Sequence, residues 1–173
     1  MRKHTKTLTF TALLLALGIA LPHLVHSIGG QPAGAMWLPL HLVALVAGLC
    51  FGPVSGLMVG ALSPLLRFAI LGMPPPPLLW FMILEVAAYG AAAGLFRKQM
   101  KMPAWVSLLF AQLIGRGVRM LSLVVAASLF GFEGPAAMAV LTTELVAGLP
   151  GIALQWAVVP PTVKLLDKHA RRP

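Results

Sequence analysis

The chain has 173 residues, of which 59% are apolar and only 10% are charged, and its mean hydropathy is +0.91. Soluble domains carry about one quarter charged residues, so this composition excludes a water-soluble globular fold. Thirteen Lys and Arg residues against four Asp and Glu give a net charge of +9, but too little polar surface remains to form a nucleic-acid-binding patch. We therefore expect one membrane domain over residues 1–173 that binds lipid and no nucleic acid.

Six apolar segments are separated by Gly and Pro clusters or by basic residues, which predicts an all-α bundle of six transmembrane helices. The segments lie near residues 7–27, 38–51, 54–71, 78–96, 104–130 and 137–163. The second segment is short and meets the third through Gly52 and Pro53, so these two are predicted to form a helical hairpin with a tight turn. Four consecutive prolines at 74–77 predict a stiff, extended cap on the outer face.

Ten of the thirteen basic residues fall in three places that six spans would bring to one side of the membrane. They are Arg2, Lys3, Lys6, Arg97, Lys98, Lys101, Lys164, Lys168, Arg171 and Arg172. By the positive-inside rule this side is the cytoplasm, so we predict a multi-pass protein of the cell membrane with both termini in the cytoplasm. The outer connections, near 28–37, 72–77 and 131–136, contain no Lys or Arg.

The first segment also imitates a secretory signal, because basic residues precede its apolar run and Ala33-Gly34-Ala35 resembles a cleavage site. Cleavage there would leave five spans and would place the next basic loops on the wrong side of the membrane. The apolar run is also longer than a usual signal core. We therefore expect this segment to be retained as the first span.

Charged residues remain within the predicted spans, where each would cost at least about 2.5 kcal/mol if it were unpaired at the membrane centre. They are Arg67, Glu85, Arg116, Arg119 and Glu144. The 1.5 Å rise per residue places most of them within roughly 10 Å of the outer surface and Arg119 at about 16 Å, with Arg116 near the middle. Because Gln112, Arg116 and Arg119 follow an i, i+4, i+7 pattern, they are expected to share one interior face.

This outer layer predicts a small-molecule site in which a few polar groups are set into an apolar pocket. The candidate substrate-binding residues are His41, Arg67, Trp80, Glu85, Tyr89, Arg119 and Glu144. The alternative is that the Arg and Glu residues only brace the bundle, because buried ion pairs also occur for structural reasons. A metal site at His23, His26 and His41 has no supporting spacing motif, so neither metal nor cofactor is expected.

Sequence motifs of enzymes are missing from the chain. Ser55 lies in a Gly-Pro-Val-Ser-Gly run that does not match the G-x-S-x-G nucleophile motif. Neither a P-loop lysine motif nor a dinucleotide fingerprint is present, and the single cysteine, Cys50, permits neither an internal disulfide nor a CxxC site. We therefore expect that the protein is not an enzyme and that any ATP it depends on is hydrolysed by another subunit.

Small residues recur at every fourth position of the first span, at Ala12, Ala16 and Ala20. Such a stripe predicts a groove in which another helix can approach closely. The pattern fits a partner protein and a neighbouring helix of the same bundle equally well.

The block at 38–48 (LPLHLVALVAG) resembles the membrane-embedded substrate-binding subunits, or S components, of energy-coupling factor (ECF) vitamin transporters. The likeness continues through Gly52-Pro53, Gly56, Gly60 and the runs at 63–67, 71–75 and 85–90, and it covers nearly the whole chain. The sequence looks like the branch that contains pantothenate, folate and cobalamin-precursor S components.

This resemblance implies a six-helix subunit that binds a vitamin near the outer face and has no catalysis of its own. It also implies that an A-x-x-x-A motif, matched here by Ala12 and Ala16, docks onto a transmembrane coupling subunit while two ATPase subunits drive uptake. A cobalamin precursor or a pantothenate-like vitamin is the favoured substrate. Two other classes stay open: a self-sufficient transporter coupled to protons through Glu85 and Glu144, and a membrane enzyme or assembly factor.

Overall fold

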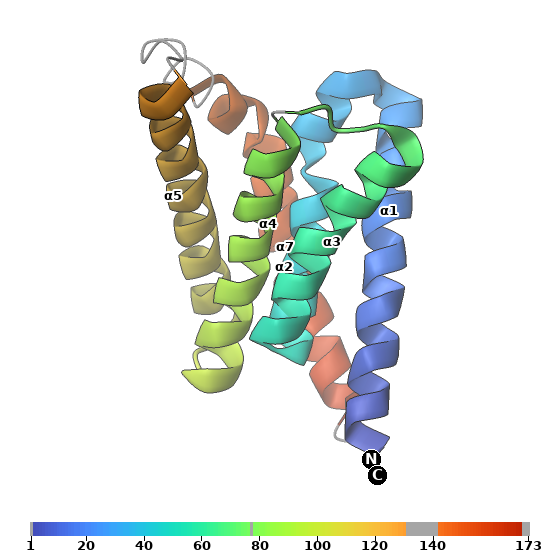
Figure 1. Ribbon diagram of the computed structural model, residues 1–173. Coiled ribbons are helices and arrows are strands. Elements are labelled where there is room, and N and C mark those ends of the chain that lie inside the picture. Colours follow the sequence, from blue (N-terminus) through green and yellow to red (C-terminus); the bar gives the residue numbers. More distant parts are fainter. Residues whose placement is uncertain (1, 77, 131–141, 171–173) are drawn as a thin grey trace.

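A computed structural model describes residues 2–76, 78–130 and 142–170 of the chain, and these residues form helices without any strand (Figure 1). In chain order the elements are α1 (Arg2–Trp37), α2 (Pro39–Phe51), α3 (Pro53–Leu71), α4 (Leu78–Gly94), the π-helical turn η1 (Leu95–Gln99), α5 (Ala104–Phe130) and α7 (Leu149–Ala170). A short helical segment at 142–147 precedes α7. Six helices in this part of the chain are long and apolar enough to cross a membrane, which confirms the predicted all-α bundle of six spans.

The beginning of α1, the η1 turn and the end of α7 lie at the same end of the bundle, which we call the terminal end (Figure 1). Of the predicted basic clusters, η1 contains Arg97 and Lys98, and α7 contains Lys164 and Lys168. Arg171 and Arg172 lie outside the described residues. The described residues of these predicted basic clusters are therefore gathered at one end, as their spacing along the sequence predicts.

Helix α2 forms the centre of the bundle and contacts α1, α3, α4, α5 and α7. Ten of its 13 residues are buried. Leu45 and Leu49 pack with Tyr89, Leu108 and Val159 in the largest apolar cluster. A helix enclosed by its neighbours on all sides needs no polar face, which explains why the α2 segment is almost uniformly apolar.

The hairpin predicted at Gly52 and Pro53 is confirmed. Gly52 adopts a φ of 101°, which L side chains rarely adopt, and Pro53 begins α3, where its missing N–H costs no hydrogen bond. The helices on either side of this turn then pack closely against α4. A Cβ atom on Gly90 would lie only 2.1 Å from the carbonyl oxygen of Gly56, so α3 and α4 meet backbone to backbone.

The outer connection expected near 28–37 is itself helical. Helix α1 bends at Gly30 (φ 67°, ψ −165°), and residues 31–37 continue as helix across the end of the bundle opposite the terminal end (Figure 1). Glycine permits this backbone conformation, and Pro32 fits the first turn of the helix that follows the bend. Leu38 (φ 49°) then reverses the chain into α2.

The boundaries predicted for the sixth span, 137–163, are wrong. The helix of this span begins at Leu149 and continues to Ala170, whereas residues 137–141 lie outside the described part of the chain. Pro150 lies in the first turn of α7, where a residue without an N–H is tolerated. Glu144 therefore belongs to the short helix at 142–147, which precedes the span, and not to the span itself.

Candidate functional site

A cavity of about 150 Å³ lies among helices α1 to α5, the loop after α3 and the segment at 142–147. We call this end of the bundle the cavity end. Most of the wall is apolar and consists of Pro22, Gly34, Ala35, Leu38, Pro39, Leu40, Met73, Pro74, Leu78 and Met82. Seven polar or charged residues complete the lining: His26, His41, Arg67, Glu85, Arg116, Arg119 and Glu144.

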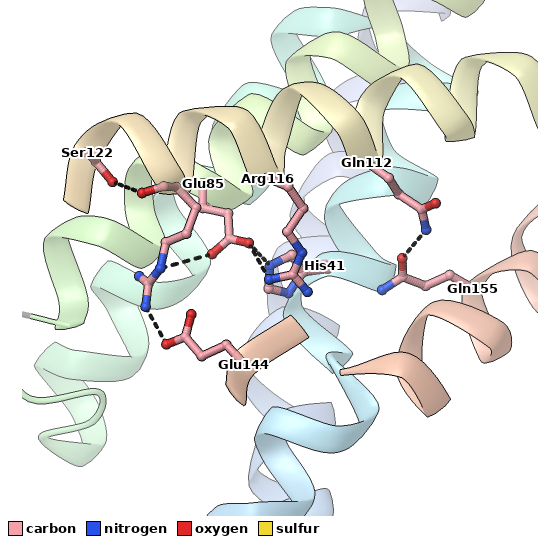
Figure 2. A network of polar contacts seen from close by, with 8 residues as sticks. His41, Glu85, Gln112, Arg116, Ser122, Glu144 and Gln155 are labelled. Carbon is pink, nitrogen blue, oxygen red and sulfur yellow. Dashed lines mark hydrogen bonds and ion pairs between the residues drawn. The ribbon is translucent and has the colours of Figure 1, made fainter. Parts of the chain in front are cut away.

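Glu85 of α4 is the hub of the charged residues and is only 3% exposed. Its Oε1 atom lies 3.3 Å from Nε2 of His41 on α2 and accepts a hydrogen bond of 3.2 Å from Nη1 of Arg116 on α5 (Figure 2). Its Oε2 atom lies 3.9 Å from Nε of Arg119. One carboxylate therefore joins three helices, which offsets the high cost of burying its charge.

Arg119 extends this network to the segment that precedes α7. Its Nη2 atom donates a hydrogen bond of 2.6 Å to Oε1 of Glu144, and its guanidinium group lies 5.4 Å from the centre of the Phe81 ring. The residue is only 2% exposed. Charge-assisted hydrogen bonds of this length are among the stronger polar interactions in proteins, so the segment at 142–147 is tied firmly to α5.

Arg67 lines the same cavity from α3 but takes no part in this network. The residue is only 5% exposed. Within the described residues no carboxylate lies within 4.0 Å of its guanidinium nitrogens, and its Nε atom donates no hydrogen bond. The cavity thus contains one buried cation that the surrounding described side chains leave without a counter-charge.

A neutral polar layer lies next to the charged one. Gln112 donates a hydrogen bond of 2.8 Å to Gln155 (Figure 2) and accepts one of 2.9 Å from Trp156. Gln112 is one helical turn from Arg116 on α5, so this layer lies directly beside the charged residues. Tyr89 is also fully buried, and its ring meets the His41 ring edge to face at 4.8 Å.

Of the seven residues predicted to bind substrate, five line the cavity: His41, Arg67, Glu85, Arg119 and Glu144. The other two are aromatic, and neither is among the described residues that line it. Trp80 is 60% exposed on α4, whereas Tyr89 packs behind His41. In this structure the apolar wall next to Glu85 is formed by Met82 and Leu78.

Sequence reasoning missed two lining residues, Arg116 and His26. The depth estimate placed Arg116 near the membrane centre, although its spacing from Gln112 and Arg119 signalled the correct face. His26 donates a hydrogen bond of 2.6 Å from Nδ1 to the Pro22 carbonyl oxygen. A Cβ atom on Gly34 would lie 2.1 Å from the His26 ring, so only glycine allows this fit.

The three histidines considered as metal ligands are placed differently. His26 and His41 line the cavity, whereas His23 is exposed on α1. The described residues contain no group of three or more His, Cys, Asp or Glu side chains that could hold a metal ion.

The alanine stripe of α1 faces away from the rest of the bundle. Ala12, Ala16 and Ala20 are exposed. The opposite side of α1 is the buried one, and there Thr11 donates a hydrogen bond of 3.0 Å to Ser55 of α3. The described part of the chain therefore leaves the groove of small side chains uncovered.

The sequence model of one protein family, described as "ECF transporter, substrate-specific component", matches residues 6–163. No curated protein and no solved structure matches the chain. The matched region begins near the start of α1 and reaches into α7, so it includes every residue that lines the cavity.

Proposed function

The chain belongs to the substrate-specific component family of ECF transporters, and from this we propose that its cavity captures a vitamin or vitamin precursor for uptake. Members of this family are substrate-binding subunits in the membrane and not enzymes. With six helices able to cross a membrane, the chain is a multi-pass protein of the plasma membrane.

The observation that carries the proposal is the convergence of buried polar side chains on one small cavity. His41, Arg67, Glu85, Arg119 and Glu144 come from four helices and the segment at 142–147. A mostly apolar wall with a few fixed polar groups is the usual form of a small-molecule site. The sequence resemblance supports a pantothenate-like vitamin or a cobalamin precursor as the substrate.

We propose that the cavity end faces the outside of the cell and the terminal end faces the cytoplasm. Support comes from the basic residues, which are concentrated at the terminal end, since positive charge is retained on the cytoplasmic side of membranes. In this orientation the cavity takes its substrate from outside.

The exposed alanines on α1 are the proposed docking surface for the transmembrane coupling subunit. Small side chains at every fourth position let a partner helix approach closely, and Ala12, Ala16 and Ala20 are uncovered in this chain. Two ATPase subunits bound to the coupling subunit would supply the energy, since the sequence contains no nucleotide-binding motif.

The test is reconstitution into liposomes with and without the coupling and ATPase subunits, after mass spectrometry has identified the small molecule retained by the purified chain. We expect uptake of that compound only with the partner subunits present and ATP supplied. Uptake by the chain alone, driven by a pH gradient and abolished by a protonophore, would contradict the proposal and favour the proton-coupled alternative. Release of a chemically altered compound would instead indicate an enzyme.

A further inference from the structure

We infer that the ligand of this cavity is a compact carboxylic acid whose acid group pairs with Arg67. The inference rests on the proposed function, because it names the chemical class of the substrate in the same cavity. Three independent features carry it: the balance of charges, the kind of polar atoms left without partners, and the size of the cavity.

The charges of the described residues that line the cavity do not cancel. Three arginines face two carboxylates, which leaves one positive charge when both histidines are neutral. The carboxylates are already engaged, Glu85 with Arg116 and Arg119, and Glu144 with Arg119. The surplus therefore resides on Arg67, which is 5% exposed. Because a buried charge without a partner is costly, an anionic ligand gains binding energy there that a neutral one does not.

The polar atoms left without hydrogen bonds point to the same class of ligand. Among the described residues that line the cavity, the buried guanidinium atoms without a partner are Nε of Arg67, Nε and Nη2 of Arg116, and Nε and Nη1 of Arg119. All of these atoms are hydrogen-bond donors, whereas no carboxylate oxygen of Glu85 or Glu144 is buried without a hydrogen bond. Both ring nitrogens of His41 also have no hydrogen bond, and a neutral imidazole has one donor and one acceptor. Most of the unpartnered nitrogens are thus arginine donors, and the planar fork of arginine fits the two oxygens of a carboxylate.

The dimensions of the cavity limit the rest of the ligand. Its volume of about 150 Å³ is small for a ligand site, since pockets for drug-sized molecules measure about 300 to 1,000 Å³. The apolar part of the lining is mostly proline, leucine and methionine, which favours an aliphatic or small cyclic body. A pantothenate-like acid has this chemistry, whereas a corrinoid macrocycle is far too large.

The experiment measures thermal stabilisation and equilibrium binding of the purified full chain in detergent with matched pairs of compounds. The acids are pantothenate, nicotinate, biotin and lipoate, and each is paired with its neutral alcohol or amide. Thiamine and riboflavin serve as controls without a carboxylate. In parallel, mass spectrometry identifies small molecules that co-purify with the chain from cells grown in rich medium. We expect at least one acid to bind and its neutral counterpart to bind about 10- to 100-fold more weakly, as a charge-assisted hydrogen bond provides.

Variants then connect this preference to one side chain. Arg67→Gln should reduce the affinity for the acid about 10- to 100-fold and leave the neutral counterpart unaffected. Arg67→Lys keeps the charge but loses the fork and should retain part of the preference. Arg97→Gln, the same change outside the cavity, should retain all of it. If Arg67→Gln does not fold, the comparison of each acid with its neutral counterpart on the wild-type chain still tests the inference.

The outcomes separate this inference from the proposed function. Preference for a neutral or cationic compound, or an acid preference that survives in folded Arg67→Gln, overturns the inference and leaves substrate binding intact. If no compound binds and none co-purifies, the proposed function fails and the inference fails with it.

Discussion

The two ends of the molecule use charged residues in different ways. At the terminal end Arg97 pairs with Asp167, and these side chains remain 19% and 31% exposed. At the cavity end the side chains of Arg119 and Glu85 are 2% and 4% exposed. Water can solvate the first pair, so its charges cost little and agree with a role in orienting the chain in the membrane. The enclosed charges must be compensated by one another or by a ligand, which is why they mark the candidate site.

The largest expected effect is a loss of stability when the central carboxylate of the cavity end, Glu85, is removed. Replacing Glu85→Ala removes the carboxylate shared by His41, Arg116 and Arg119, and we expect the free energy of unfolding to fall by about 3 to 5 kcal/mol because buried cations lose their partner. The matched change Asp167→Ala at the terminal end should cost less than about 1 kcal/mol. Unfolding of both variants in mixed detergent micelles measures the difference. Equal losses at the two ends would show that burial does not distinguish the two groups of charges.

Binding measurements can distinguish a residue that lines the cavity from an exposed residue outside it. Arg119→Ala removes the donor of Glu144 and one of the two arginines beside Glu85, and it should weaken binding of the co-purified compound by about 2 to 5 kcal/mol. Trp80→Ala should change binding by less than about 0.5 kcal/mol, since this indole is exposed outside the cavity. Isothermal titration of variants that elute as folded protein gives both values. Unchanged affinity in Arg119→Ala would mean that the charges only brace the helices.

Between the two ends, the glycine contacts of α3 and α4 are expected to act through packing alone. Gly90→Ala would place a Cβ atom 2.1 Å from the Gly56 carbonyl oxygen and should cost about 1 to 3 kcal/mol of stability. Gly117→Ala on α5 is the control, because no atom lies within 4 Å of the position of its Cβ, and it should be neutral or stabilising by up to about 1 kcal/mol. Thermal melts in detergent compare them. Equal tolerance of both changes would contradict backbone contact between α3 and α4.

Much of this architecture could be predicted from the sequence because lipid imposes simple rules. Apolar segments of spanning length fixed the helices, and the Gly52-Pro53 pair fixed the hairpin. The rarity of charge in the spans also identified the residues that line the cavity: a buried Arg or Glu needs a partner, and helical spacing gives the face on which that partner lies.

Features that depend on tertiary contacts could not be predicted in this way. The sequence predicted a connection near 28–37, but not that the chain continues as helix beyond the bend at Gly30, and it did not reveal the break at Gly148. Counting along one straight helix therefore assigned Glu144 to the span. The direction in which Trp80 faces could not be predicted either. An outer aromatic residue can face lipid or ligand, and only the rotation of α4 in the bundle places it away from the cavity.

The smallest expected effect on the chain itself concerns the exposed face of α1. Ala16→Leu adds bulk at an uncovered position and should change stability and ligand affinity by less than about 0.5 kcal/mol. Its effect should appear only in assembly, because a leucine side chain fills the groove in which a coupling helix would pack. We expect about tenfold less coupling subunit to co-purify, since overpacking a close helix contact costs at least about 1 kcal/mol. Ala157→Leu, at an exposed alanine on α7, is the matched control and should assemble normally. Loss of ligand binding with assembly unchanged would mean that the stripe supports the fold of this chain. Equal loss of assembly in both variants would place the docking surface beyond α1.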